Sequence, residues 1–347
     1  MIQHSRPCLG KEEIRAVAKV IRSGRIACGR ETKMFEREAA RWMGVRHAVA
    51  LSSGTKALEL ALRACGIGRG DEVLIPTYAC SALWHAVQRT GASAVLVDCD
   101  LETLNPSPED AASRLTKRTR AVILPNLFGL PCDPVSYRLP ARVKVIQDCA
   151  QAMGARLGRK SVGVTGDACV LSFYATKLMT CGEGGMLLSD SQVLTEAARD
   201  LREYDEKNPD KVRENAKPSD ILSAIGREQL KKLGSFLKRR AQLAALYDRL
   251  LGGTAGLILP VRQPGRVYFR YVVRLQNAAA EKIRTRLAAR GIQAEKPVFR
   301  PLHLDVPSRG RFPNAQRAYA SALSLPLYPL LSQGDISRVA SALRDLL

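Results

Sequence analysis

The chain is poor in aromatic residues and has no long apolar run. Aromatic residues make up 5% of the 347 positions, which leaves few side chains that could stack on nucleic-acid bases. No apolar run reaches the length that a membrane-spanning helix requires. Segment 1–7 also lacks the apolar core of a signal peptide. We therefore expect a cytoplasmic protein that neither crosses a membrane nor binds nucleic acid.

The cysteines show no spacing that would suit a disulfide framework or a zinc site. Their number, nine, is odd, and no CxxC pair occurs. Because both kinds of site need paired spacing, we expect reduced thiols that mostly fill the core, and no bound metal.

Positive charge is in excess, since 54 Lys and Arg against 33 Asp and Glu give a net charge of +21. Such a charge suits nucleic acid, an anionic membrane surface or a small polyanionic substrate. The basic residues are spread along the chain. Because few aromatic residues accompany these charges, the charge alone leaves nucleic acid the less favoured of these partners.

Short apolar segments alternate with helical patterns through the first half of the chain. The full length of 347 residues suggests two domains. Strands are predicted at 47–51, 72–75, 94–97, 121–124 and 143–146. This order predicts an α/β fold with a mainly parallel sheet, covered on both faces, that binds ligands at the carboxyl ends of its strands.

The second half begins with a long, basic, amphipathic helix predicted at 223–251. A strand at 269–275 and helices at 278–290 and 333–346 follow, which indicates a smaller α+β unit. We therefore expect a large domain at 1–250, including the long helix, and a small one at 251–347.

One lysine stands where a chain could hold an aldehyde cofactor as a Schiff base. Lys177 follows the apolar run 168–174 and precedes the glycine-rich turn 182–185. A lysine in an apolar setting loses proton affinity and becomes a usable nucleophile. A solvated lysine beside a glycine turn would show the same local pattern.

Other candidate groups also fall at the ends of predicted strands. Segment 52–55 opens a helix, so it is either a phosphate site or an ordinary N-cap. Asp148 could hold a protonated heterocyclic nitrogen or cap a buried helix. Gln151 would lie on the same side as Asp148 if a helix begins there. Ser172 adds a hydroxyl, and Asn215 lies in a polar loop.

Taken together, these segments resemble the DegT-type (DegT/DnrJ/StrS) sugar aminotransferases, pyridoxal-phosphate enzymes of the aspartate-aminotransferase fold (fold type I). The resemblance covers nearly the whole chain. The matching segments are 23–24, 35–36, 44–45, 53–58, 68–73, 128–129, 148–151, 172–177, 182–186, 215–226, 291–292, 301–303 and 323–326.

The resemblance implies a role for each candidate residue. Lys177 would form the Schiff base and carry protons, Asp148 would pair with the pyridine nitrogen, and Gln151 would bond to the phenolic oxygen. An asparagine matching Asn215 reaches the phosphate of the neighbouring subunit in this family, which implies a homodimer with shared active sites. The phosphate would be held by Ser172 and by the amides of Gly54, Thr55 and Lys56.

The chain departs from the family at the cofactor ring. Family members often carry a stacking aromatic residue where this sequence has Cys80, so Tyr78 or Trp84 would have to compensate, or the thiol would cover the ring. His303 is either a packed residue or a cleft residue. The candidates for binding substrate are Tyr78, Arg25, Lys217, His303 and Arg300.

The resemblance implies a transaminase that moves an amino group from L-glutamate or L-glutamine to a keto-sugar, which we expect to be nucleotide-linked, for polysaccharide or amino-sugar synthesis. Two alternatives stay open. One is a sugar dehydratase of the same fold, although such enzymes carry histidine in place of the lysine at 177. The other is a regulatory or nucleic-acid-binding protein built on this scaffold, which the net charge would suit.

Overall fold

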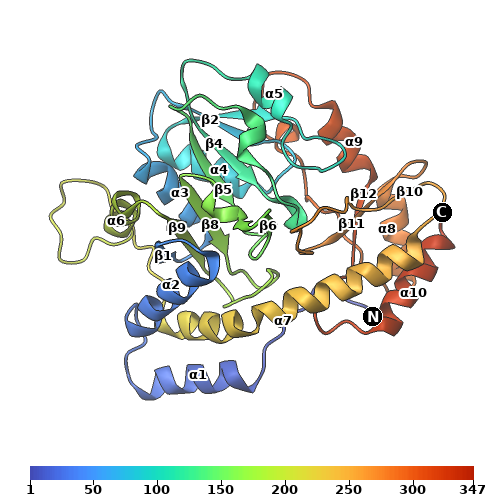
Figure 1. Ribbon diagram of the computed structural model, residues 1–347, viewed down its shortest axis with the longest axis horizontal. Coiled ribbons are helices and arrows are strands. Elements are labelled where there is room, and N and C mark those ends of the chain that lie inside the picture. The colour runs from blue at the N-terminus through green and yellow to red at the C-terminus, as the bar shows by residue number, and fades with distance from the viewer.

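The computed structural model describes all residues, 1–347, and its centre is a seven-stranded sheet of order β1-β9-β8-β5-β4-β2-β3 (Figure 1). The strands are β1 His47–Leu51, β2 Glu72–Pro76, β3 Ser93–Val97, β4 Thr119–Pro125, β5 Lys144–Asp148, β8 Ala168–Ser172 and β9 Gly185–Ser189. All run parallel except β9, which is antiparallel to both β1 and β8. The predicted α/β fold with a mainly parallel sheet is confirmed.

Helices cover both faces of this sheet. The helices of the large unit are α1 Lys11–Arg22, α2 Arg30–Met43, α3 Gly54–Ala64, α4 Ala82–Thr90, α5 Pro108–Ser113, α6 Gln192–Leu201 and α7 Asp220–Leu251, of which α1 packs on α7 instead of the sheet. In β1, Val49 and Leu51 join the core with α3 and α4, whereas Ala48 and Ala50 join the core with α2 and α7. Successive side chains of a strand point to opposite faces, so one short apolar strand supplies both cores.

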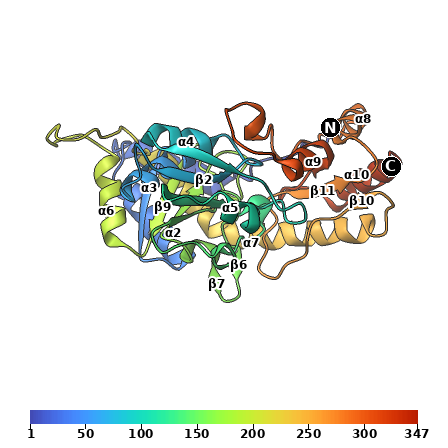
Figure 2. The same ribbon diagram turned by 90° about the horizontal axis from the view of Figure 1, so that it is seen from above.

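A second, smaller unit lies at the far end of α7 (Figure 2). Its strands β10 Leu257–Ile258, β11 Tyr271–Leu275 and β12 Ala322–Leu325 form an antiparallel sheet, which packs with α8 Ala280–Ala289, α9 Pro313–Ser321 and α10 Gln333–Arg344. A short hairpin, β6 Arg156–Leu157 and β7 Lys160–Ser161, projects from the large unit.

The long helix α7 joins the two units. Leu233 belongs to the core of the large unit, and Leu243 and Leu251 belong to the core of the small one, which also takes in Ile2. The N-cap Ser219 accepts a hydrogen bond from the backbone N–H of Leu222 at 3.3 Å, so the helix begins before the predicted residue 223. The division at 250/251 stays a prediction, because α7 and the N-terminus contribute to both sides of it.

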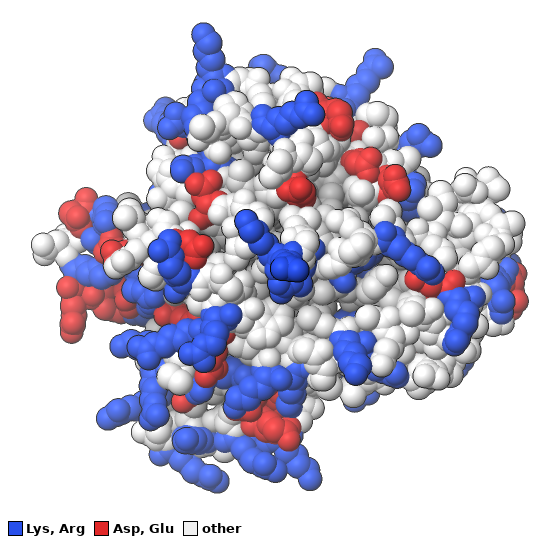
Figure 3. Space-filling model, viewed as in Figure 1, with Lys and Arg blue, Asp and Glu red and all other residues white.

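Charge is distributed unevenly over the surface. Lys and Arg side chains are densest over α1 and α2 in Figure 3, and acidic side chains gather at the loop that follows α6. No helix is long and apolar enough to cross a membrane, and no cluster of three or more His, Cys, Asp or Glu side chains is placed to hold a metal ion.

Candidate active site

A cavity of about 330 Å³ opens at the carboxyl ends of the parallel strands. It brings together residues from the β1–α3 turn, the segment after β2, the end of β5 and the turn after β8. Among the residues predicted from the sequence, its walls contain Gly54, Thr55, Cys80, Asp148, Gln151, Ser172 and Lys177. These residues lie far apart in the sequence and meet because parallel strands end at one edge of a sheet.

Lys177 lies half-buried in the turn that follows β8. Its backbone N–H donates to the carbonyl of Tyr174 at 2.9 Å, and its Nζ lies 5.4 Å from the centroid of the Phe269 ring. Burial lowers the pKa of the Lys177 ammonium, while the negative charge of Asp148 opposes that shift. The side chain therefore has the environment that a nucleophilic amine requires.

Asp148 ends strand β5 and is 8% exposed. Its Oδ1 accepts a hydrogen bond from the backbone N–H of Ala150 at 3.0 Å. Burial raises the pKa of this carboxyl, and the Ala150 N–H and the charge of Lys177 act in the opposite sense. A buried carboxylate in a cavity wall favours a cationic partner, and a protonated ring nitrogen is such a partner.

Gln151 presents a donor to the cavity because its oxygen is already used. The backbone N–H of Phe128 donates to Oε1 of Gln151 at 2.7 Å. A backbone N–H can only donate, so this bond settles which end of the amide is oxygen. Nε2 is left to donate, as a phenolate oxygen requires.

The start of α3 and the end of β8 form a tight cradle. A Cβ on Gly54 would lie 2.8 Å from the Cβ of Ser172, so only glycine lets the two backbones approach this closely. The Ser53 hydroxyl accepts from the backbone N–H of Lys56 at 3.1 Å. The N–H groups of Gly54 and Thr55 therefore remain at a helix N-terminus, where anions bind.

The structure does not bring Lys56 into the cavity. Its amide is occupied by the Ser53 cap, and its Nζ pairs with Glu59 at 2.8 Å and Glu214 at 3.2 Å. Phosphate binding by the Lys56 amide stays a prediction. The amides of Gly54 and Thr55 suit this role better.

The aromatic candidates also lie elsewhere. Tyr78 is fully buried in the core, its hydroxyl has no hydrogen-bond partner, and burial raises its pKa. Trp84 is half-buried beside the ring of His85. Cys80, which is exposed, lines the cavity itself. The thiol therefore occupies the place where an aromatic residue was expected, and the idea that Tyr78 contacts substrate there does not fit its position.

His303 is packed between two residues. Its Nδ1 lies 2.8 Å from the Thr77 hydroxyl, and its ring stacks on Phe312 with centroids 4.9 Å apart. Burial lowers its pKa. The packed interpretation of His303 suits this geometry.

The remaining substrate candidates lie outside the cavity. Lys217 pairs with Asp205 and, at 3.6 Å, with Glu203. Arg300 pairs with Asp305 at 2.6 Å. Arg25 lines a separate cavity of about 750 Å³ formed mainly by the loop between α1 and α2.

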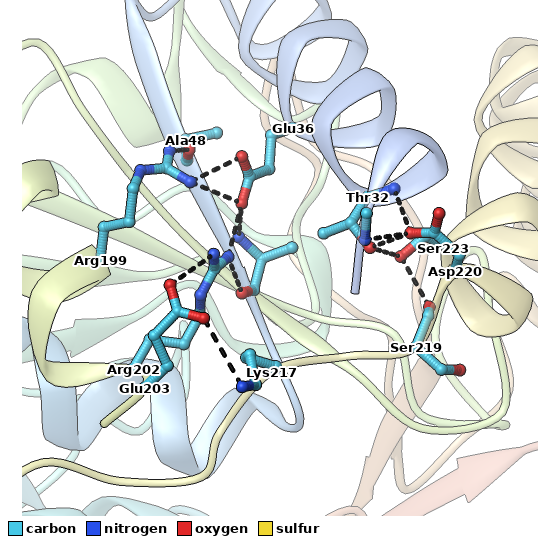
Figure 4. Close-up of polar contacts among 12 residues, drawn as sticks. Thr32, Glu36, Ala48, Arg199, Arg202, Glu203, Lys217, Ser219, Asp220 and Ser223 are labelled. Carbon is cyan, nitrogen blue, oxygen red and sulfur yellow. Dashed lines mark hydrogen bonds and ion pairs between the residues drawn. The ribbon is translucent and has the colours of Figure 1, made fainter. Parts of the chain in front are cut away.

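Asn215 is exposed at the surface, and its neighbour Ala216 is hydrogen-bonded through both of its backbone polar groups. The Ala216 N–H donates to the Arg202 carbonyl at 2.9 Å, and the Ala216 carbonyl accepts from the Ser52 N–H at 2.8 Å. The Arg202 side chain is fixed in turn by an ion pair with buried Glu36 at 2.9 Å (Figure 4). The backbone at Asn215 is thus held firmly while its side chain faces outward.

The sequence did not point to several residues around the lysine. Tyr174, Leu83 and Glu183 line the cavity, and Phe269 packs beneath Lys177 from the small unit. Tyr174 and Glu183 could have been suspected only because they belong to the segments on either side of Lys177 that the sequence singled out. Phe269 had no such signal, because its approach depends on how the two units pack.

Comparison with known proteins agrees with this geometry. Residues 7–344 match the model of the DegT/DnrJ/EryC1/StrS aminotransferase family. The chain belongs to this family. The family and its named transaminases favour an aminotransferase over the dehydratase alternative.

Named relatives of this aminotransferase span nearly its whole length. The spore coat polysaccharide biosynthesis protein SpsC of Bacillus subtilis is 33% identical and covers 99% of this chain and 97% of its own. The dTDP-3-amino-3,4,6-trideoxy-alpha-D-glucose transaminase of Streptomyces venezuelae is 35% identical, covering 96% and 93%. The solved aminotransferase TlmJ from Streptoalloteichus hindustanus has a TM-score of 0.94 at 33% identity, covering 99% and 98%.

Aminotransferases of this family use pyridoxal phosphate, and the cavity fits that group. The lysine with a lowered pKa suits the aldehyde, and the buried Asp148 suits the ring nitrogen. The donor end of Gln151 suits the phenolic oxygen. The cradle between Gly54 and Ser172 suits the phosphate.

Proposed function

We propose that this aminotransferase moves an amino group from L-glutamate or L-glutamine to a nucleotide-linked keto-sugar. The product would enter a surface polysaccharide or an amino-sugar natural product. The observation that carries the proposal is Lys177, whose pKa is lowered by burial in a cavity that it shares with Asp148. The Streptomyces venezuelae relative, a transaminase of a dTDP-linked sugar, supports the class of acceptor.

Six residues of the cavity would have separate parts in this reaction. Pyridoxal phosphate, when bound, supplies a ring that withdraws electrons from the carbon carrying the amine. Asp148 holds the proton on the ring nitrogen, and Gln151 donates to the phenolic oxygen. Gly54, Thr55 and Ser172 hold the phosphate. The Nζ of Lys177 would hold the aldehyde and carry protons; burial lowers its pKa, which favours the neutral amine that both roles need.

The acceptor sugar brings negative charge to a basic protein. A nucleotide diphosphate carries at least two charges, and the net charge of +21 favours its approach. The nine free cysteines suit a reducing compartment, and we place the enzyme in the cytoplasm, where nucleotide-linked sugars would reach it.

We further propose that the active enzyme is a homodimer in which Asn215 of the partner subunit reaches the phosphate cradle. Asn215 is exposed in its own chain and outside the cavity, and its backbone is held in place through Ala216. A fixed, outward-facing amide is suited to bind a group on another copy.

A visible spectrum of the protein loaded with pyridoxal phosphate tests the reaction. Adding L-glutamate or L-glutamine should convert the absorption band to that of the aminated cofactor, and a nucleotide-linked keto-sugar should restore it. Lys177→Ala should lack the original band. Lys56→Ala, whose side chain pairs outside the cavity, should keep it. A band that neither amino acid changes would refute the transaminase, and an unchanged band in Lys177→Ala would refute the role of the lysine.

Mixed dimers test the shared site. Lys177→Ala and Asn215→Ala should each be inactive alone. If the site combines Lys177 of one subunit with Asn215 of the other, mixing the two variants under subunit exchange should restore about a quarter of wild-type activity, because half of the dimers carry one intact site. A mixture as inactive as its parts would show that both residues act within one chain.

A further inference from the structure

Asn215 lies between two residues that are fixed to the large unit. The Glu214 N–H donates to the carbonyl of Leu201 at 2.9 Å, and the Ala216 carbonyl accepts from the N–H of Ser52 at 2.8 Å. Glu214 is half-buried, Asn215 is exposed and Ala216 is buried. This alternation is that of an extended chain, whose successive side chains point in opposite directions. The segment thus turns Glu214 toward the protein and Asn215 away from it.

The carboxylate of Glu214 is held by two cations of α3. Its Oε2 lies 3.2 Å from Nζ of Lys56, and its Oε1 accepts from Nη1 of Arg63 at 3.0 Å. Nη2 of Arg63 also donates to the carbonyl of Val212 at 2.5 Å. The three charged side chains are no more than 29% exposed. Solvent and salt therefore screen these ion pairs less than pairs on the open surface.

Glu59 supplies this cluster with a second carboxylate. It is 3% exposed, and it pairs with Lys56 at 2.8 Å and with Arg63 at 3.7 Å. Burial alone would raise the pKa of Glu214, but Lys56 and Arg63 lower it below its ordinary value, so the side chain is ionised at neutral pH. If Glu214 is replaced, Glu59 still compensates both cations, and α3 should keep its place.

The loop that precedes Glu214 has little support of its own. It follows α6 and projects from the large unit in both views (Figures 1 and 2), and residues 208–212 are all exposed. Glu214 is the first side chain after this exposed stretch that forms ion pairs with α3. These ion pairs therefore fix the position from which Asn215 extends.

We propose that Glu214 is a positioning residue, whose ion pairs with Lys56 and Arg63 hold Asn215 where it reaches the phosphate cradle of a second copy of this chain. This inference rests on the proposed homodimer and adds the cluster that presents its shared residue. The helix α3 also begins at the cradle of its own chain, with Gly54. An effect of Glu214 on that cradle is the alternative, and mixed dimers give opposite results in the two cases.

The first measurement is cofactor affinity, which needs no turnover. Cofactor-free protein is titrated with pyridoxal phosphate while the absorption band formed at Lys177 is followed. In Glu214→Ala the apparent Kd should rise about tenfold, the lower end of what a lost hydrogen bond to a charged group costs. Glu214→Gln should recover part of this loss, because its amide oxygen still accepts from Arg63. Asp210→Ala is the matched control: it removes an ion pair with Arg213, 2.7 Å long, from the same loop and should bind the cofactor as wild type does.

The second measurement is the same titration on dimers mixed under subunit exchange. With Lys177→Ala as the partner of Glu214→Ala, about half of the sites that form the band should regain the wild-type Kd, because each mixed dimer joins an intact Lys177 to a correctly held Asn215 of the other chain. With Asn215→Ala as the partner, no site should regain it, because Glu214 and Asn215 then act as one unit of the same chain.

The reverse pattern would overturn the inference. If the mixture with Asn215→Ala regains the wild-type Kd and the mixture with Lys177→Ala does not, Glu214 supports the cradle of its own chain. An unchanged Kd in Glu214→Ala would overturn it as well. If Lys177→Ala and Asn215→Ala do not complement one another, the proposed shared site fails and the role of Glu214 fails with it. If they do complement while Glu214→Ala binds the cofactor normally, only the role of Glu214 fails.

Discussion

The side-chain oxygen of Gln151 accepts a 2.7 Å hydrogen bond from the backbone N–H of Phe128. Phe128 has a φ of 57°, in the left-handed region that non-glycine residues rarely adopt. The next residue is Gly129, where a Cβ would lie 2.0 Å from the carbonyl oxygen of Val267. Gln151 thus stabilises a tight turn with one end of its amide and offers the other end to the cavity.

Two substitutions separate these roles of Gln151. Gln151→Glu keeps an acceptor for the Phe128 N–H but cannot donate to the phenolic oxygen, whereas Gln151→Leu can do neither. We expect both variants to bind pyridoxal phosphate more weakly. Only Gln151→Leu should lower the free energy of unfolding of the cofactor-free protein, by about 1–3 kcal/mol, because the Phe128 N–H loses its partner. Urea unfolding and cofactor titration measure the two effects. Wild-type cofactor affinity in Gln151→Glu would exclude the donor role.

Gly54→Ala should damage the phosphate cradle. The new Cβ would lie 2.8 Å from the Cβ of Ser172, so the start of α3 or the end of β8 must shift. We expect the affinity for pyridoxal phosphate to fall at least about tenfold, which corresponds to about 1.4 kcal/mol. Gly234→Ala is the control, because its Cβ would meet nothing within 4 Å in the middle of α7. It should raise stability by about 0.5–1 kcal/mol and leave cofactor binding unchanged. Equal cofactor affinities in the two variants would contradict the cradle.

The two arginines that bind Glu36 should differ in their contribution to stability. The Arg202 side chain is 7% exposed and pairs with Glu36 at 2.9 Å, whereas the Arg199 side chain is 41% exposed and pairs at 3.0 Å. Arg202→Met leaves a buried carboxylate short of its partner and should cost about 3–5 kcal/mol. Arg199→Met removes a solvent-screened pair and should cost about 0–1 kcal/mol. Similar losses for both variants in urea unfolding would show that burial does not govern this network.

His4 should make the protein less stable in mild acid. It is buried against the Ser324 hydroxyl, with Nε2 and Oγ 2.9 Å apart. Burial, together with the charges of Arg270 and Arg240, lowers its pKa from 6.5 to about 3. The unfolded chain therefore binds a proton between these values and the folded chain does not. The stability contributed by neutral His4 is complete above pH 6.5 and is lost as the pH falls toward 3.

The measurement compares wild type with His4→Gln. Between pH 7 and pH 5 the free energy of unfolding of wild type should fall by about 2 kcal/mol more than that of the variant. Parallel pH profiles for the two proteins would show that His4 titrates normally in the folded state.

Much of the fold followed from short-range patterns. Short apolar segments that alternate with helical patterns predicted the mainly parallel sheet that the structure has. Because parallel strands end at one edge, residues after separate strands could be expected to meet, and Asp148, Ser172 and Lys177 do so. The family resemblance added the chemistry that these residues share.

The direction of individual side chains did not follow from such patterns. Tyr78 and Cys80 are two residues apart, yet the ring is buried in the core and the thiol lines the cavity. The N–H of Lys56 is bound by the N-cap residue Ser53, although the resemblance implied that the amides of Gly54, Thr55 and Lys56 all hold the phosphate. Each outcome depends on which neighbour packs closest, and no local periodicity encodes that.

By itself, the sequence determined the chemical groups of the site and the strand ends that carry them. Backbone propensities and the twofold alternation of strands are local properties and predicted the strand ends, whereas the family resemblance implied the roles of Lys177, Asp148 and Gln151 there. Only the tertiary structure decided that the Phe269 ring lies next to the lysine, with its centroid 5.4 Å from Nζ of Lys177. Phe269 precedes β11 in the sequence yet packs into the hydrophobic core of α2 and α7, a contact between distant segments that local sequence does not contain.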